Sequence, residues 1–325
     1  VSQGHAVYAS DTSFVTLTNS GTEVARLQLT HSNPVMKNNE NRFLTYGIGS
    51  ASYEISSFDE TLYSGNAENK IYTGDVASNG TYCLVTEDNG YLTTLYAYSK
   101  NNNRIYKYSF SEYYITSVAI NKDGSGCVAT GVSSDKGSAV TGVYVLDFSQ
   151  EKPVSTYKIS GDSVLDCKYL TSDTAVLVGS QASYIVKKGE KNYKTVSYED
   201  KTLSNYCFNT DTSTYTMALS RSGDGRSVAL ISYNSNGEAQ YTINTEHKAD
   251  SLSVYKGTVA ILDGNVVYGY NQNGDLLYST NSGTGSKKIV LASDYTAYIL
   301  SVNQIRFIDL DSVSSDDTAQ TSKQE

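Results

Sequence analysis

The stretch from Tyr72 to Phe110, YTGDVASNGTYCLVTEDNGYLTTLYAYSKNNNRIYKYSF, contains four short strands separated by turns. An inner strand, YTGDVA, ends at the turn SNG, and the apolar core strand TYCLVTED follows it. The strand TTLYAYS, the turn KNNNR and the outer strand IYKYSF complete the unit. The next unit repeats the plan with YITSVAI, the turn NKDGS, GCVATGV, GVYVLDF and VSTYKIS. Four strands repeated at intervals of about forty residues predict a β-propeller.

The core strand of this unit recurs along the whole chain. Its centres are Val7, Leu44, Leu84, Val128, Leu177, Met217, Ala260 and Tyr298. Third strands also number eight, and both ends of the chain carry one, so we expect eight four-stranded antiparallel blades, with seven as the alternative. The first unit shows no inner strand before His5, and the last shows no outer strand after Leu310. No stretch has a 3.6-residue apolar period, so we expect almost no helix.

The composition is that of one β-rich domain. The chain has 325 residues, 29 of them Tyr and only 2 Pro, so no Pro-rich hinge divides it. We expect a single propeller domain over residues 1–311. The last residues, 312–325, are polar and acidic and lack apolar periodicity, which predicts a disordered tail.

The charge excludes two classes of partner. The formal net charge is −9, and no basic run exceeds the pairs Lys187–Lys188 and Lys287–Lys288. Nucleic-acid binding needs a concentrated basic face, so we expect no nucleic-acid partner. An anionic membrane surface would repel the protein for the same reason.

The four cysteines fall at matching places in the repeat, Cys83 with Cys127 in core strands and Cys167 with Cys207 in inner strands. Equivalent residues of neighbouring blades should lie too far apart for a disulfide, which needs Cα atoms within about 7 Å. We therefore expect four buried thiols.

Neither metal nor nucleophilic catalysis has a clear motif. His5, His31 and His247 show no paired spacing, and we interpret them as solvated or incidental histidines. No GxSxG elbow is present. The segments 121–126 (NKDGSG) and 271–275 (NQNGD) lack the full calcium-loop spacing, and we interpret both as tight turns. We expect no metal and no cofactor.

Two sets of residues remain as ligand-binding candidates. Asp75 and Asp166 lie in inner strands, where they would face the propeller channel and could serve a polysaccharide hydrolase or lyase as paired carboxylates. The stretch 91–114 is rich in tyrosine, and alternate strand residues share a face, so its rings could form a ladder that binds a glycan or peptide. The predicted tyrosines are Tyr91, Tyr96, Tyr98, Tyr106 and Tyr108.

The turn in DGSGCVATGV, after ITSVAI, resembles the turn between the first two strands of WD40-like and YVTN-like propeller repeats. The wider pattern, with GTEVARLQLTHSNPVMKNNENRFLTYG and NGTYCLVTEDNGYLTTLYAYS, resembles a family of uncharacterised extracytoplasmic proteins of Gram-positive bacteria. True WD40 blades carry a GH…WD pair, which is missing here because the chain has no Trp.

The resemblance implies a propeller tethered to the cell membrane by one N-terminal helix, and it supplies no catalytic residues. The chain begins at Val1 rather than Met, so we expect an anchor to have been removed upstream. We predict a monomeric, non-catalytic binding or scaffold module at the cell envelope, with a protein or glycan partner. The alternative is the hydrolase or lyase that uses the channel-facing carboxylates.

Overall fold

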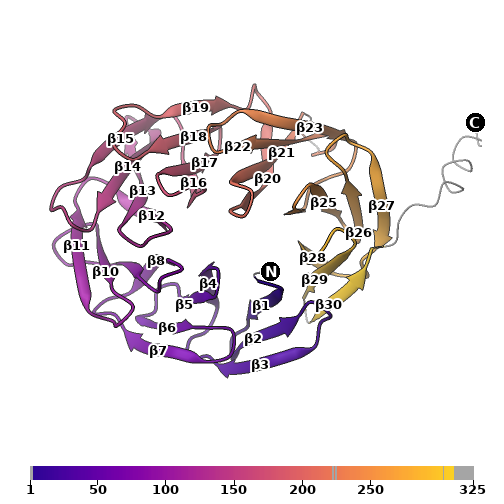
Figure 1. Ribbon diagram of the computed structural model, residues 1–325. Helices are drawn as coiled ribbons and strands as arrows, with labels where there is room; N and C mark the ends of the chain where they lie inside the picture. Colours follow the sequence, from indigo (N-terminus) through magenta and orange to yellow (C-terminus); the bar gives the residue numbers. More distant parts are fainter. Residues whose placement is uncertain (1–2, 222, 224, 303, 311–325) are drawn as a thin grey trace, which may run out of the picture. The chain divides into compact units, whose positions relative to one another are not determined.

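Eight antiparallel sheets follow one another along the chain in a computed structural model that describes residues 3–221, 223, 225–302 and 304–310 (Figure 1). Thirty strands and no helix occur within these residues. Six sheets have four strands, and the first and last have three. The fold is an eight-bladed β-propeller, which confirms the all-β prediction and its preferred blade count. None of the described residues forms a helix able to cross a bilayer.

The contacts divide the chain into two compact units. The N-terminal unit comprises Ser2–Ser197 with Ser235–Gly237, and it contains blades 1 to 5. The C-terminal unit comprises the described residues of 198–234 and 238–310, and it contains blades 6 to 8. The predicted tail at 312–325 lies outside the described residues.

The N-terminal unit contains nineteen strands. Blade 1 consists of β1 (His5–Ala9), β2 (Ser13–Thr18) and β3 (Glu23–Gln28). Blade 2 consists of β4 (Pro34–Asn39), β5 (Arg42–Gly47), β6 (Ser52–Ser56) and β7 (Thr61–Asn66). Blade 3 consists of β8 (Ile71–Val76), β9 (Tyr82–Thr86), β10 (Thr93–Tyr98) and β11 (Arg104–Phe110). Blade 4 consists of β12 (Tyr114–Ile120), β13 (Gly126–Asp135), β14 (Ser138–Asp147) and β15 (Ser155–Ser160). Blade 5 consists of β16 (Val164–Tyr169), β17 (Thr174–Gly179), β18 (Ala182–Lys187) and β19 (Lys194–Ser197).

The C-terminal unit contains the other eleven strands. Blade 6 consists of β20 (Thr202–Asn209), β21 (Thr214–Ser220), β22 (Val228–Asn234) and β23 (Ala239–Thr245). Blade 7 consists of β24 (Ser251–Tyr255), β25 (Thr258–Asp263), β26 (Val266–Tyr270) and β27 (Leu276–Asn281). Blade 8 consists of β28 (Ser286–Leu291), β29 (Thr296–Ser301) and β30 (Ile305–Asp309). Among the described residues, blade 1 has no inner strand before β1 and blade 8 has no outer strand after β30.

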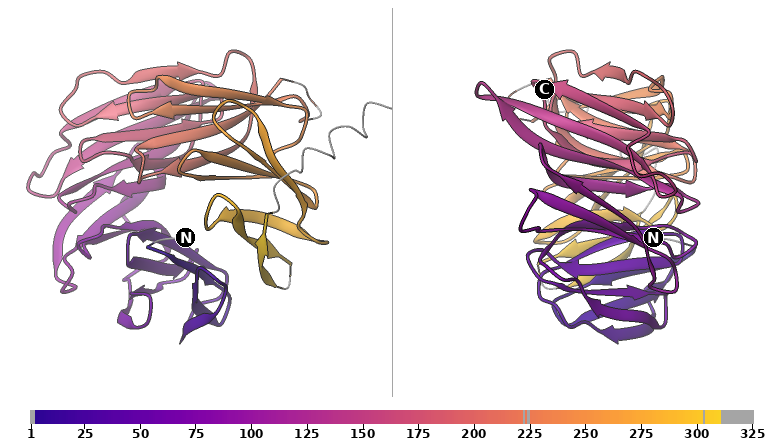
Figure 2. Two further views of the ribbon diagram at one scale, coloured as in Figure 1. Left: turned by 45° about the vertical axis from the view of Figure 1, so that its right-hand side comes forward. Right: turned by 90° about the vertical axis from the view of Figure 1, so that its left-hand side faces the viewer.

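Hydrophobic clusters between neighbouring blades form the core. The core strands β9 and β17 are buried at every residue, because each lies between two other blades. Outer strands such as β15 alternate between exposed and covered positions, as expected where one face meets solvent. The hairpin of β13 and β14 has ten residues in each strand and extends beyond its neighbours (Figure 2).

A β-bulge recurs in the inner strands. Register shifts place one extra residue in five of them, namely Tyr72, Thr116, Leu165, Ser204 and Lys287. Each bulge lies near the start of its strand, where the extra residue re-aims the side chains that precede it. The bulge is therefore a further regular feature of the repeat, and the spacing of the hydrophobic residues does not reveal it.

The predicted match of Cys83 with Cys127 is wrong, because the connection between the paired residues of the inner and core strands spans residues 77–81 in blade 3 but residues 121–126, one residue more, in blade 4. Measured from the bulge, Cys83 pairs with Asp75 but Cys127 pairs with Ile120, so the two thiols differ by one position. Because successive strand residues point to opposite faces, the two thiols belong to one cluster between blades 3 and 4. All four cysteines are free thiols. Cys83, Cys127 and Cys167 are buried, and Cys207 is half-buried.

Candidate functional site

The inner strands of blades 2, 3 and 5 bring four charged side chains together. Lys37 comes from β4, Asp75 from β8, and Asp166 and Lys168 from β16. Lys37 Nζ lies 3.6 Å from Asp166 Oδ1, and Lys168 Nζ lies 3.8 Å from Asp75 Oδ1. We call these four residues the inner-strand charge cluster. Its two cations balance its two anions.

Asp75 links blade 3 to blade 4 through a hydrogen bond. Its side chain is buried, at 1% exposure, and Oδ2 accepts a 3.0 Å hydrogen bond from the backbone N–H of Ile120 in blade 4. Oδ1 is buried without a hydrogen bond to the described residues and faces the Lys168 ammonium. A buried carboxylate with these partners joins strands and is closed to a large substrate.

Asp166 is held by its own strand and by blade 4. Its Oδ1 accepts hydrogen bonds from the Cys167 backbone N–H at 2.9 Å and from Ser117 Oγ at 3.1 Å. Burial alone would lower the pKa of Lys37, but Asp166 and then Asp75 outweigh burial and raise that pKa above its usual value. Lys37 therefore remains a cation and neutralises the carboxylate beside it.

The Cys167 thiol lies next to this cluster, 3.3 Å from Ser117 Oγ. Burial, followed by the charge of Asp166, raises the pKa of Cys167 to about 12. The thiolate is the nucleophilic form of cysteine, so this residue is unreactive at neutral pH. The cluster offers neither a nucleophile nor a pair of accessible carboxylates.

The predicted tyrosines lie on both faces of blade 3. Tyr98 stacks on Tyr82 with ring centroids 5.0 Å apart, on the side of blade 2. Tyr106 and Tyr108 lie opposite Ala97 and Leu95, on the side of blade 4, where Tyr106 contacts Phe148 at 5.2 Å. Tyr98 therefore forms no common ladder with Tyr106 and Tyr108, because residues on opposite faces of a sheet cannot line one groove.

Access to solvent differs among the same tyrosines. Tyr91 is 52% exposed, in the loop between β9 and β10. Tyr96 is buried beneath two cations, with Arg104 Cζ 5.6 Å and Lys107 Nζ 5.5 Å from its ring centroid. Most of the aromatic surface in this stretch is used in packing between blades, and a ligand could approach Tyr91 most easily.

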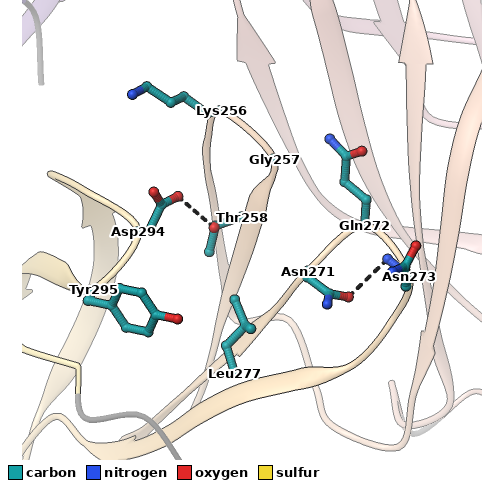
Figure 3. Close-up of a pocket in the computed structure, with 9 residues that line it drawn as sticks. All are labelled: Lys256, Gly257, Thr258, Asn271, Gln272, Asn273, Leu277, Asp294 and Tyr295. Carbon is teal, nitrogen blue, oxygen red and sulfur yellow. Dashed lines mark hydrogen bonds between the residues drawn. The ribbon is translucent and has the colours of Figure 1, made fainter.

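The C-terminal unit contains a hollow that the sequence did not indicate. Its volume is about 500 Å³, and it lies among the turns β24–β25, β26–β27 and β28–β29 (Figure 3). The lining residues are Lys256, Gly257, Thr258, Asn271, Gln272, Asn273, Leu277, Asp294 and Tyr295. The hollow combines amides, one carboxylate, one ammonium group and an aromatic ring.

Asn271 shapes one wall of this hollow. Its Oδ1 accepts hydrogen bonds from the backbone N–H groups of Asn273 at 2.9 Å and Asp275 at 3.0 Å, and its Nδ2 donates to Asp275 Oδ2 at 2.8 Å. These bonds close the NQNGD segment as a tight turn, as predicted. Because the turn uses the Asn271 amide, Gln272 and Asn273 supply the side-chain amides of the wall (Figure 3).

A second wall joins blade 7 to blade 8. Thr258 Oγ1 donates a 2.7 Å hydrogen bond to Asp294 Oδ1, which fixes the turn between β28 and β29. Tyr295 follows directly and is 46% exposed, while its ring also contacts Tyr278 at 6.0 Å. Lys256 lies at the rim, with its Nζ 5.3 Å from the Tyr255 ring centroid. The Tyr295 ring thus presents an apolar surface beside polar groups that are held in place.

The turn at 121–126 is also built from its own side chains. Asn121 Oδ1 accepts from the Gly126 backbone N–H and Asp123 Oδ1 from that of Ser125, each at 3.0 Å. These bonds confirm the interpretation as a tight turn. Within the residues that the structure describes, no group of three His, Cys, Asp or Glu side chains is placed to hold a metal ion.

Solved structures similar to this chain are propellers with low sequence identity. The C-terminal WD40 domain of Sif2 is 15% identical, with a TM-score of 0.60, and the match covers 83% of this chain and 78% of that domain. BamB from Moraxella catarrhalis is 12% identical, with a TM-score of 0.56, and the match covers 95% of this chain and 94% of that one. A functionally unknown protein from Desulfotomaculum acetoxidans is 11% identical, with a TM-score of 0.56, and coverage of 95% and 100%. At these identities the likeness concerns the fold alone.

No functionally curated protein matches the sequence. A family model described as a family of unknown function, DUF5711, matches residues 2–310. This agrees with the resemblance to an uncharacterised propeller family. The chain belongs to the DUF5711 family of unknown function.

Proposed function

We propose that this propeller is a non-catalytic binding or scaffold module that acts outside the cytoplasm, at a bacterial cell envelope. The observation that carries the proposal is the state of the two predicted carboxylates. Asp75 and Asp166 are each bonded to backbone N–H groups and paired with a lysine. Glycoside hydrolysis needs an acid and a base or nucleophile that flank a substrate bond, and these two side chains are occupied.

The hollow between blades 7 and 8 supports binding over catalysis. Asp294 is the one carboxylate among its lining residues, and Thr258 already donates to it. A two-carboxylate mechanism therefore lacks its second group there. Turns that project from a rigid stack of strands suit recognition, because the strands hold the turns in fixed positions.

The envelope location rests on the sequence resemblance. The net charge of −9, with no run of basic residues longer than a pair, fits a protein or glycan partner better than a nucleic acid. The proposal includes a monomeric state and attachment to the membrane through the N-terminal helix that the resemblance implies. Protease added to intact cells of the source bacterium should degrade the protein, and protection until the cells are lysed would contradict the location.

The binding role is tested by affinity capture from envelope extract, combined with an assay for released sugar ends. We expect a stable complex with an envelope protein or glycan and no release of reducing or unsaturated ends. Turnover of a bound polysaccharide would favour the hydrolase or lyase. If the Asp75→Asn and Asp166→Asn variants abolished that turnover but retained the fold, the catalytic alternative would stand.

A further inference from the structure

We propose that the hollow between blades 7 and 8 binds a neutral oligosaccharide. This inference rests on the proposed binding function and deepens it by naming a site and a ligand class. The hollow has a volume of about 500 Å³, within the range of small-molecule sites. It is built from three turns of two adjacent blades, so its walls are held by the strands beneath them.

The apolar wall fits one face of a sugar ring. Tyr295 is 46% exposed and Leu277 lies near it, so a flat apolar surface borders the hollow (Figure 3). A pyranose ring has a face of C–H groups that packs on an aromatic ring, and its hydroxyl groups point outward from the edge. A tyrosine meets both needs, because its ring is apolar and its hydroxyl group is polar.

The polar wall fits the hydroxyl groups. Gln272 and Asn273 each carry an amide with both donors and an acceptor, and a sugar hydroxyl is likewise both donor and acceptor. Asp294 accepts one hydrogen bond from Thr258, and a carboxylate has capacity for more. Two side-chain amides and a carboxylate beside an exposed ring match a carbohydrate better than a wholly apolar ligand.

The charge of the lining selects a neutral ligand. Lys256 and Asp294 are the charged residues among those that line the hollow. Their charges are opposite, so the lining has no net charge. The Lys256 ammonium lies over the Tyr255 ring rather than in a cluster of cations. Phosphate or sulfate groups are normally bound by several cations or by arginine forks, which these lining residues lack.

Gly257 provides a way to alter the hollow without removing a lining side chain. A Cβ atom at this position would lie 2.7 Å from Gln272 Nε2, so Gly257→Ala should displace the Gln272 amide. The displaced atom ends a flexible side chain, and we expect the fold to tolerate the change. Loss of binding in this variant would show that the ligand depends on where the Gln272 amide lies.

The probes are soluble neutral hexasaccharides of glucose, xylose, mannose and N-acetylglucosamine, with heparin as a charged comparison. Binding is measured by titration calorimetry and by saturation-transfer NMR on the intact chain. We expect saturable binding of at least one neutral probe. Tyr295→Ala should weaken it about tenfold or more, since the ring face is lost. Gln272→Ala, Asn273→Ala and Gly257→Ala should each weaken it severalfold.

Tyr114→Ala is the matched control, because Tyr114 is similarly exposed, at 49%, but lies in blade 4. It should bind as the wild type does. Wild-type affinity in all four hollow variants would overturn the inference, as would binding of heparin alone or of no probe. If the wild type also captured no envelope component, the proposed function would fail with it; a captured protein without any saccharide binding would leave that function standing.

Discussion

Asp162 shows how much one buried carboxylate can organise in this fold. Its Oδ1 accepts hydrogen bonds from the backbone N–H groups of Ser163 at 2.7 Å and Ser180 at 2.9 Å. Its Oδ2 accepts from the Ala182 backbone N–H at 3.2 Å and from Tyr184 Oη at 2.8 Å. The side chain thereby fixes the turn between β17 and β18 to the loop that enters blade 5.

Replacing Asp162 should destabilise the protein strongly. Asp162→Ala leaves several buried donors without an acceptor, and we expect a loss of about 3 kcal/mol in the free energy of unfolding. Asp162→Asn keeps one acceptor oxygen and should lose less. Urea denaturation followed by circular dichroism measures both values. Equal stability of the alanine variant and the wild type would show that the turn is held by other contacts.

Tyr278 and Gly269 are in contact, and substitutions at the two positions should have different effects on stability. The Tyr278 hydroxyl is buried without a hydrogen-bond partner among the described residues, so Tyr278→Phe should change the stability by less than about 1 kcal/mol or increase it. A Cβ at Gly269 would overlap the Tyr278 ring, so Gly269→Ala should cost about 2 kcal/mol or more. Thermal unfolding of both variants tests this order, and the reverse order would contradict it.

His31 predicts a pH dependence. Of the two predicted alternatives, solvated or incidental, the first is wrong for His31, which is 4% exposed; burial lowers its pKa despite the opposing charge of Glu54. A pKa below the unfolded value near 6.5 means that protons bind the unfolded chain more tightly. The contribution of His31 to the free energy of unfolding is therefore complete above about pH 6.5, and it is lost as the pH falls from there through the lower pKa of the folded protein.

The pH dependence can be isolated with a variant. The free energy of unfolding of the wild type should decrease between pH 7.5 and about pH 5, and His31→Leu should remove part of that slope. Urea titrations at four pH values measure it. Identical slopes in the two proteins would assign the dependence to other groups.

At the scale of the element, the strands were predictable and their registers were not. The apolar run TYCLVTED and its turn SNG indicate β9 and the turn before it directly. The extra residue of a bulge, such as Tyr72 in β8, leaves no trace in the pattern of apolar residues. Consequently Asp75 and Asp166 could be placed on inner strands, but their lysine partners could not be named.

The inner-strand charge cluster makes a prediction about coupling between blades. Lys168→Met should lower the free energy of unfolding by about 1–3 kcal/mol, because it removes the ammonium group that lies 3.8 Å from the buried Asp75 carboxylate. Adding Asp75→Asn restores neutrality and keeps an acceptor for the Ile120 N–H, so the double variant should recover part of the loss. A double-mutant cycle by denaturant unfolding measures the coupling, and strict additivity would show that the pair is not coupled.

At the scale of the molecule, the repeated strands predict the fold, but they do not predict the hollow. Eight similar core strands, from Val7 to Tyr298, indicate the propeller; seven of their centres are buried, and Val7 in the first blade is half-buried. The hollow brings Gly257, Gln272 and Tyr295 together from three turns, and no motif connects them in the sequence. The Asn-Gly turn was visible, but which side chains it presents to its neighbours depends on tertiary packing.

The four thiols lie in three different clusters between blades, so their reactivity reports local opening at each cluster separately. Cys83 and Cys127 report on the cluster between blades 3 and 4, Cys167 on that between blades 4 and 5, and Cys207 on that between blades 6 and 7. A pulse of a small alkylating reagent followed by peptide mass spectrometry would therefore time the separation of three interfaces in one experiment, without any introduced label. The order of their modification would show which part of the propeller loosens first.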